Sequence, residues 1–296
     1  MASVQDLKRR VRSVRNTRKI TKAMELVASA RLRRAQTRIE AMRPYAETMR
    51  ELIAGVGRAA SSVRGLPLLQ QRDEVKNVAI VPLTGDRGLA GPFNAQILRR
   101  AFALERQLRG EGANVRFVAV GKKGRSTLAF RRYEVAAEFT GFTDRPGYAD
   151  AQAIAHRVAE LFTEGEVDRV VLLYNAYVSP LVQRVTEQDV LPISADILET
   201  DEDERRDDAL RGDFIFEPEP EEILERLLPV YLETQIYRAL LESAASEQGA
   251  RMTAMRNASK NAGELIDALT LQMNRARQAE ITQEILEVVG GAEALR

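Results

Sequence analysis

The chain has 296 residues, enough to bury a core, and a formal net charge of +1. It has no cysteine, which excludes disulfide bonds and thiolate metal sites, and it has no apolar run near the roughly 18 residues that argue for a membrane-spanning helix. Charged residues make up 29% of the chain and aromatic residues 5%, a composition typical of proteins built largely from long helices.

The first 60 residues carry a helical pattern with a long apolar seam. Alternating steps of three and four from Val4 to Val56 meet sixteen positions, and thirteen of them are apolar. A sustained spacing of about 3.5 residues is typical of two helices that supercoil around each other. We therefore predict a coiled-coil helix over residues 1–60, roughly 80 Å long, with a local bend at Pro44.

The seam of this helix is broken at three positions, Arg18, Thr21 and Glu25. Cations surround the break, because residues 1–43 carry thirteen Lys or Arg and only three acidic residues. The apolar residues beside the break are offset from the seam: Ile20, Met24 and Val27. Apolar surface ringed with cations suits an acidic protein partner, so we interpret the break as a stretch that serves a moving partner as well as its own helix.

The middle of the chain, residues 75–216, alternates between short apolar runs and amphipathic stretches. This alternation predicts an α/β domain with a Rossmann-like, mostly parallel sheet. The predicted strands are Asn77–Leu83, Val115–Val120, Glu134–Thr140, Val167–Tyr174 and a hairpin-like return at Leu181–Val190. The predicted helices are Pro92–Leu108 and Tyr148–Phe162, and Asp213–Phe216 is a candidate edge strand. The acidic block 196–213 is predicted to be a solvated loop.

From residue 217 to residue 296 the helical pattern returns. Apolar residues recur every three or four positions from Leu241 to Ala276, and the apolar set then shifts to the stretch from Ile281 to Val289. The acidic run at 217–222 is a helix start signal, because acids favour the N-terminal end of a helix dipole. We predict a coiled-coil helix about 100 Å long. Two seams at opposite ends of one chain predict a long antiparallel coiled coil.

Signals for small-ligand sites are weak in this sequence. The turn "TGDRGLAGPFN" at 84–94 places three glycines between a strand and a helix, which resembles a phosphate-binding loop. Its spacing fits neither the dinucleotide fingerprint nor the P-loop, so a tight turn is the simpler interpretation, and "GKKGRS" at 121–126 is likewise interpreted as a basic surface turn. The single histidine, His156, has no second histidine or cysteine to form a metal site or a nucleophilic triad. We predict no catalytic residue, no metal and no cofactor.

Two alternative functions stay open on the residues alone. One is a phosphate- or nucleotide-binding α/β enzyme that uses Gly85–Gly91. The other is a coiled coil that binds nucleic acid through its basic helix, which a steeply salt-dependent affinity for DNA or RNA would indicate. The basic stretch lacks stacking aromatic residues, which counts against the second alternative.

The whole chain resembles the gamma subunit of the F-type ATP synthase, in its bacterial form. The resemblance rests on five motifs in order along the chain: "RNTRKITKAMELVASARLRRAQ", "RPYAETM", "TGDRGLAGPFN", "SEQGARMTAMRNASKNAGELI" and "NRARQAEITQEILEVVGGAEAL". It implies a non-catalytic central-stalk rotor that transmits torque between a membrane c ring and a catalytic ring, and so couples proton flow to ATP synthesis or hydrolysis. The implied partners are the hexameric ring of alpha and beta subunits, the epsilon subunit and the c-subunit ring, with no nucleic acid. Membrane association would be indirect, at the cytoplasmic face of the bacterial plasma membrane.

The resemblance also implies individual contact residues, carried over position by position. Met24, with Lys19 and Lys22 beside it, would lie at the level of acidic loops of the beta subunits. Glu247 and Arg251 would face the same neighbourhood from the other helix.

Further implied contacts lie toward the two ends of the C-terminal helix. Gln278 and Thr282 would meet catalytic subunits, and Val289 would turn in an apolar bearing. Phe216 and Glu217 fall in the foot segment near the c ring, and Phe216 lacks the hydroxyl that many relatives have there as tyrosine. The absence of cysteine and the short acidic loop argue against the thiol control implied for the chloroplast form.

Overall fold

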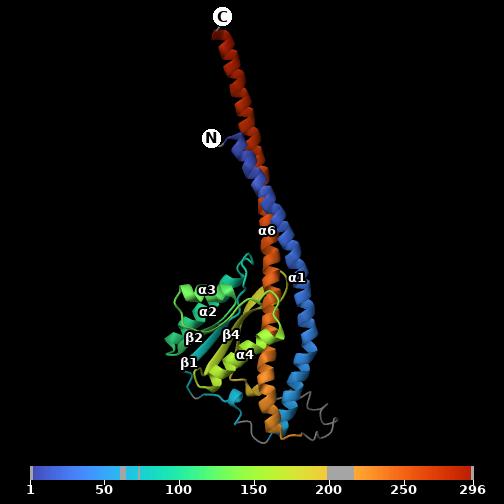
Figure 1. Cartoon of the computed structure of the whole chain (residues 1–296), viewed down its shortest axis with the longest axis vertical. Coiled ribbons are helices and arrows are strands. Elements are labelled where there is room, and N and C mark those ends of the chain that lie inside the picture. The colour runs from blue at the N-terminus through green and yellow to red at the C-terminus, as the bar shows by residue number, and fades with distance from the viewer. Residues whose placement is uncertain (1–2, 61–64, 73, 199–216, 295–296) are drawn as a thin grey trace. The chain divides into compact units, whose positions relative to one another are not determined.

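The computed structural model describes residues 3–60, 65–72, 74–198 and 217–294, and the chain divides into two compact units (Figure 1). The helical unit comprises Met1–Ser29 and Arg251–Arg296, and the sheet unit comprises Ala30–Ala250. Two long helices contribute residues to both units: α1, Val4–Ala59, and α6, Pro220–Ala294. The three-part division into residues 1–60, 75–216 and 217–296 stays a prediction.

The sheet unit is built on a five-stranded sheet with the order β3-β2-β1-β4-β5. The strands are β1 Asn77–Pro82, β2 Asn114–Val120, β3 Val135–Phe139, β4 Arg169–Tyr177 and β5 Gln183–Leu191. β1, β2, β3 and β4 pair in parallel, and β5 returns antiparallel to β4. The predicted mostly parallel sheet is confirmed, and the candidate strand at 213–216 lies outside the described residues.

Alternating residues of the buried strand β1 face two different layers. Val78 and Ile80 pack with α2 (Phe93–Gly110) in one apolar cluster, whereas Ala79 and Val81 pack in a second cluster with α4 (Tyr148–Thr163). Residues of α1 and α6 join the second cluster: Met49, Ile53, Val56, Leu224, Leu228, Leu232 and Ile236. The long helices are therefore anchored to the sheet through the same core that holds α4.

A short helix, α3 (Lys122–Phe130), begins where a basic surface turn was predicted. The chain leaves β2 through Gly121, which has a φ of 88°. A Cβ at this glycine would lie 2.1 Å from the backbone oxygen of Thr84, so no side chain fits there. The Thr84 hydroxyl donates to the Val120 oxygen at 2.7 Å and accepts from the Gly124 amide at 2.8 Å, which fixes the start of α3 against the end of β1.

The helical unit pairs the beginning of α1 with the second half of α6 (Figure 1). The hydroxyls of Thr21 and Ser259 are 2.7 Å apart, and Glu25 Oε1 lies 3.1 Å from Arg256 Nε. Partner numbers fall along α6 as they rise along α1, so the two helices run antiparallel, as predicted. Apolar seam residues on both helices are buried: Leu7, Val11, Ala28, Met252, Met255, Ala262 and Ile266.

The break in the apolar seam is a buried polar layer between the two helices. Thr21 and Glu25 are only 9% and 7% exposed, while Arg18 is exposed. The Glu25 carboxylate accepts hydrogen bonds from Lys22 Nζ at 3.0 Å and from Arg256 Nε. The hydrogen bond from Lys22 lowers the pKa of the Glu25 carboxyl, and Arg256 adds to this effect against the opposing cost of burial. The break therefore has a role inside the chain that the sequence-based interpretation missed.

Replacement of Gly121 by alanine will destabilise the chain more than the same change at Gly112. Both glycines have φ near +90°, at 88° and 91°, so both substitutions incur the backbone cost of about 1–2 kcal/mol. A Cβ at Gly112 meets nothing within 4 Å, whereas one at Gly121 meets a backbone oxygen. We expect Gly121→Ala to lower the free energy of unfolding by a further ~1–3 kcal/mol, measured by chemical denaturation. Equal losses in the two variants would contradict the steric argument.

Replacement of Glu25 by glutamine will weaken the helical unit in a pH-dependent way. Loss of the charge-assisted hydrogen bonds is expected to lower the free energy of unfolding by about 1–2 kcal/mol near neutral pH. The pKa is lowered in the folded chain, so the stabilisation is complete above the ordinary pKa of 4.5 and is lost as the pH falls through the lowered value. Thermal unfolding followed by circular dichroism at several pH values measures the difference between the variant and the parent chain.

The matched control is Glu264→Gln. The Glu264 carboxylate lies 3.9 Å from Lys260 on the exposed surface of the same unit, where an ion pair contributes about 0–1 kcal/mol. A difference between Glu25→Gln and the parent chain that stays constant down to strongly acidic pH would rule out ionised Glu25 as the source of the stabilisation.

Candidate partner-contact surface

The face of α1 beside the polar layer exposes apolar side chains to solvent. Thr21, Glu25 and Ala28 point into the seam, and residues one position earlier, at 20, 24 and 27, form the neighbouring face because the same i, i+4, i+7 spacing applies. Ile20 is 61% exposed and Val27 is 53% exposed. Met24 is half-buried, between the seam and the exposed stripe. The stripe that the sequence predicted beside the break is therefore present, and Leu26 extends the exposed apolar surface.

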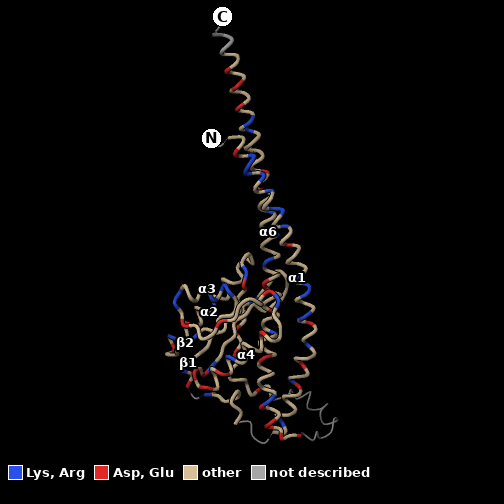
Figure 2. Tube along the Cα trace, in the orientation of Figure 1, with Lys and Arg blue, Asp and Glu red and all other residues tan. Residues whose placement is uncertain are grey.

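Positive charge surrounds this apolar stripe. Residues 1–29 carry eight Lys or Arg and two acidic residues, and Figure 2 shows the concentration of Lys and Arg along the start of α1. Lys19 and Lys22 are both exposed, although Lys22 also donates to Glu25. An acidic partner that approached this face would meet cations on flexible stems around a small apolar centre.

The last turns of α6 expose a second apolar surface. Gln278 and Thr282 are exposed, and the Thr282 hydroxyl donates to the Gln278 carbonyl at 2.9 Å. Large apolar side chains follow, all between 47% and 73% exposed: Ile281, Ile285, Leu286, Val288 and Val289. Apolar surface of this extent marks a contact site for another protein.

Three further residues with implied contacts have different surroundings. Glu217 is exposed, just before the start of α6, and Phe216 lies outside the described residues. Glu247 and Arg251 are only 1% and 7% exposed within the chain. The Glu247 carboxylate packs against Gly85, where a Cβ would lie 2.9 Å from its carboxyl atoms. Contacts of these residues with partner subunits stay predictions.

The glycine-rich turn at 84–94 uses its polar groups within the chain. The Gly85 amide donates to Asn94 Oδ1 at 2.8 Å, and the Glu247 carboxylate fills the space above Gly85. The Asp86 carboxylate accepts hydrogen bonds from three backbone amides and one hydroxyl, which belong to Lys122, Gly141 and Thr143. Burial opposes ionisation of Asp86, but these hydrogen bonds outweigh it and lower the pKa of its carboxyl. The turn has the contacts of a tight strand–helix connection whose anion is supplied by the chain itself.

The described residues offer no alternative centre of metal or membrane chemistry. His156 is exposed on α4. No group of three or more His, Asp or Glu side chains in the described ranges is placed to hold a metal ion. None of the helices in this part of the chain has an apolar stretch long enough to cross a bilayer.

Comparison with known proteins gives the chain its relatives. Residues 3–295 match the family model described as ATP synthase. The ATP synthase gamma chain of Rubrobacter xylanophilus is 47% identical over 295 residues, which cover 100% of this chain and 99% of the relative. The gamma chain of Desulfitobacterium hafniense is 46% identical, with full coverage of both chains.

Solved structures give the same result. A chain from the central stalk and c-ring structure of the Tetrahymena thermophila mitochondrial ATP synthase matches with a TM-score of 0.59 and 28% identity, covering 81% of this chain and 99% of that one. A chain from the Euglena gracilis mitochondrial ATP synthase shares the fold, with a TM-score of 0.69 and 18% identity over 99% of this chain and 94% of that one. The similarity in sequence extends along the entire length of the chain, through both long helices and the sheet. This chain belongs to the ATP synthase gamma-chain family.

Proposed function

We propose that this chain is the central-stalk rotor subunit of a bacterial F-type ATP synthase and transmits torque between the c-subunit ring and the ring of alpha and beta subunits. The observation that carries the proposal is its similarity to ATP synthase gamma chains over their full length. In this role the chain couples proton flow to ATP synthesis or hydrolysis. It performs no chemistry itself, and it is held at the cytoplasmic face of the plasma membrane through its partners.

Paired helices suit the transmission of torque. A single helix twists easily, whereas two helices with interlocked seams resist twisting because rotation of one must displace the other. The polar layer adds to this resistance, since a shift of α1 along α6 would separate Glu25 from Arg256 and bury both charges without partners. The layer thus defines one register, as a buried polar residue does in other coiled coils.

The exposed surface suits contacts that form and break repeatedly. Lys19 and Lys22 are exposed cations, and ion pairs at such positions contribute about 0–1 kcal/mol each. Contacts of this strength let an acidic loop on a beta subunit follow the rotor without holding it. The apolar end of α6 has no charged residue among its exposed large side chains, which suits a bearing in which no rotational position is favoured by a specific ion pair.

A catalytic role finds less support. The proposed alternative enzyme would bind phosphate in the turn at Gly85, but Glu247 already places a carboxylate against that glycine. A phosphate at the same point would meet this negative charge at short range. A nucleic-acid-binding role would use the basic face of α1, and that face combines its cations with exposed Ile20 and Val27 rather than with aromatic residues.

Assembly of the complex tests the proposed function directly. Co-expression of the chain with the alpha and beta subunits of its own organism is expected to yield a complex with one copy of this chain per hexameric ring, because a rotor occupies a single central position. Native mass spectrometry measures the stoichiometry. A chain that purifies alone under these conditions, or that joins in several copies, would overturn the proposal.

Replacement of Met24 by lysine tests the contact surface on α1. Met24 is half-buried, so a lysine there can extend its amine to solvent and leave the helix pair folded. We expect fewer protons pumped per ATP hydrolysed in inverted membrane vesicles, because the added charge alters contacts made in particular rotational positions. Proton uptake is measured by quenching of a pH-sensitive dye.

The matched control places a lysine on an exposed helix position of the sheet unit, Ala153→Lys on α4. It adds the same charge and side chain, and it is expected to pump as the parent complex does. Unchanged pumping per ATP in Met24→Lys, at equal assembly of the complex, would remove Met24 from the contact surface.

A further inference from the structure

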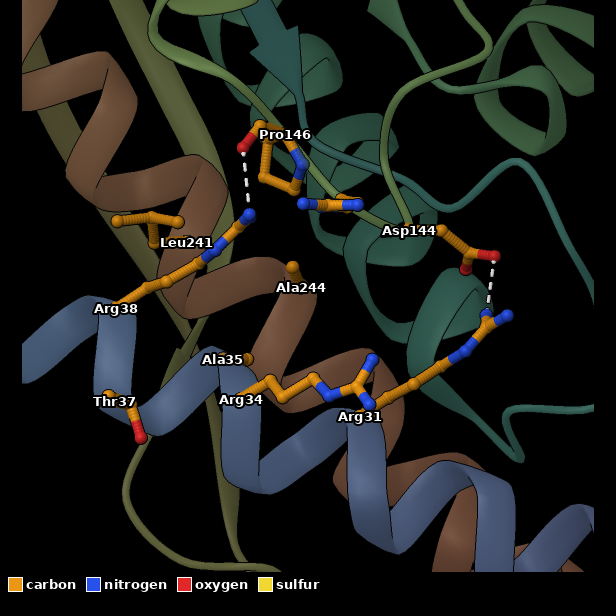
Figure 3. A pocket seen from close by; sticks show the side chains of 10 residues that line it. Arg31, Arg34, Ala35, Thr37, Arg38, Asp144, Pro146, Leu241 and Ala244 are labelled. Carbon is orange, nitrogen blue, oxygen red and sulfur yellow. Dashed lines mark hydrogen bonds and ion pairs between the residues drawn. The ribbon is translucent and has the colours of Figure 1, made fainter.

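A cavity of about 550 Å³ lies within the sheet unit, between α1, α6 and the segment that precedes α4 (Figure 3). Four arginines line it: Arg31, Arg34 and Arg38 from α1, and Arg145 from the segment before α4. The lining includes one acidic residue, Asp144. Its formal charge is therefore strongly positive, which is unusual for a cavity that the contact surfaces described above do not include.

The single acid neutralises only part of this charge. Arg31 donates to Asp144 at 2.9 Å, and Arg38 donates to the backbone oxygen of Pro146 at 3.4 Å. In the described part of the chain, neither Arg34 nor Arg145 forms an ion pair with an acidic side chain. A concave surface with excess positive charge concentrates anions, because the low-dielectric walls focus the field.

The arrangement follows from the helix period. Arg31, Arg34 and Arg38 are spaced i, i+3, i+7, which places them on one face of α1, and Figure 3 shows them reaching from that helix along the cavity. Opposite them α6 contributes Leu241 and Ala244, whose side chains offer no competing acceptor. The guanidinium groups are thus arrayed along the wall rather than gathered at one point.

The chemistry of the lining selects a class of ligand. Guanidinium groups match phosphate oxygens with pairs of parallel hydrogen bonds, and a row of them matches several phosphates in succession. The cavity has the volume of known small-molecule sites, about 300–1,000 Å³. No aromatic side chain is among its lining residues, so nothing there stacks on a base. We propose that this cavity binds a polyphosphate chain, either as free inorganic polyphosphate or as the polyphosphate group of a nucleotide.

Calorimetric titration of the purified full chain with sodium tripolyphosphate and with ATP, both without magnesium, tests the proposal. Binding is expected to weaken as the salt concentration rises. The double variant Arg34→Gln, Arg145→Gln is expected to bind tripolyphosphate at least about tenfold more weakly, because two charge-assisted contacts are lost. Arg33→Gln, on the same helix but outside the lining, is the matched control and is expected to bind as the parent chain does.

The two ligands distinguish the source of the phosphate. Equal affinity for tripolyphosphate and ATP assigns the cavity to the phosphate chain itself, and tighter binding of ATP assigns it to nucleotides. Absence of binding, or equal weakening in Arg33→Gln and in the double variant, overturns the proposal. Hexaglutamate that binds as tightly as tripolyphosphate also overturns it, in favour of an acidic protein segment.

A second measurement does not depend on the folding of the variants. Phenylglyoxal modifies exposed arginines, and mass spectrometry locates the modified residues in the parent chain. Tripolyphosphate is expected to protect Arg34 and Arg145 and to leave Arg33 reactive. Equal reactivity of all three arginines with and without tripolyphosphate would overturn the proposal.

Discussion

The register between the two terminal helices is the constraint on which the rest of the chain depends. An apolar seam alone permits neighbouring registers, because one layer of aliphatic side chains packs much like the next. The Thr21–Ser259 and Glu25–Arg256 contacts remove this ambiguity, since a shifted register would bury a carboxylate against apolar side chains. The fixed register in turn decides which side chains of α1 face solvent.

The same constraint connects the helices to the sheet. Residues from both α1 and α6 belong to the core cluster that packs under α4, so their pairing is supported by long-range apolar contacts as well as by the seam. Glu247 on α6 also closes the turn that follows β1. A rotor that receives force on its sheet and delivers it along its helices needs such shared packing, because a flexible connection would absorb the rotation.

Much of this fold could be predicted from the sequence, for definite physical reasons. The long helices have a spacing near 3.5 residues that persists for many turns, and the strands are short apolar runs between turn residues. The helix α3 was missed because its sequence is short, basic and begins with glycines, and its start is fixed by Thr84, a residue distant in sequence. Local patterns contain no information about such a contact.

The site was predictable to a smaller degree. The exposed stripe at Ile20 and Val27 follows from helix geometry, since its residues are offset from the seam. The partners of Thr21 and Glu25 could have been proposed from the antiparallel pairing, but only after the register was known. The arginine-lined cavity could not have been found from spacing alone, because Arg145 and Asp144 reach it from a different element.

One feature of the helical unit has a thermodynamic consequence. α6 continues to Ala294, whereas the register places the start of α1, at Val4, opposite the region of Ala276. The final turns of α6 therefore form a lone helix with isoleucine, leucine and valine in contact with water, a stretch too short to be stable by itself. In the free chain these turns fray, and entry into the surrounding ring is coupled to their folding. Part of the association energy is consumed in ordering them, so measured affinities underestimate how strongly the ring and the folded tip attract each other.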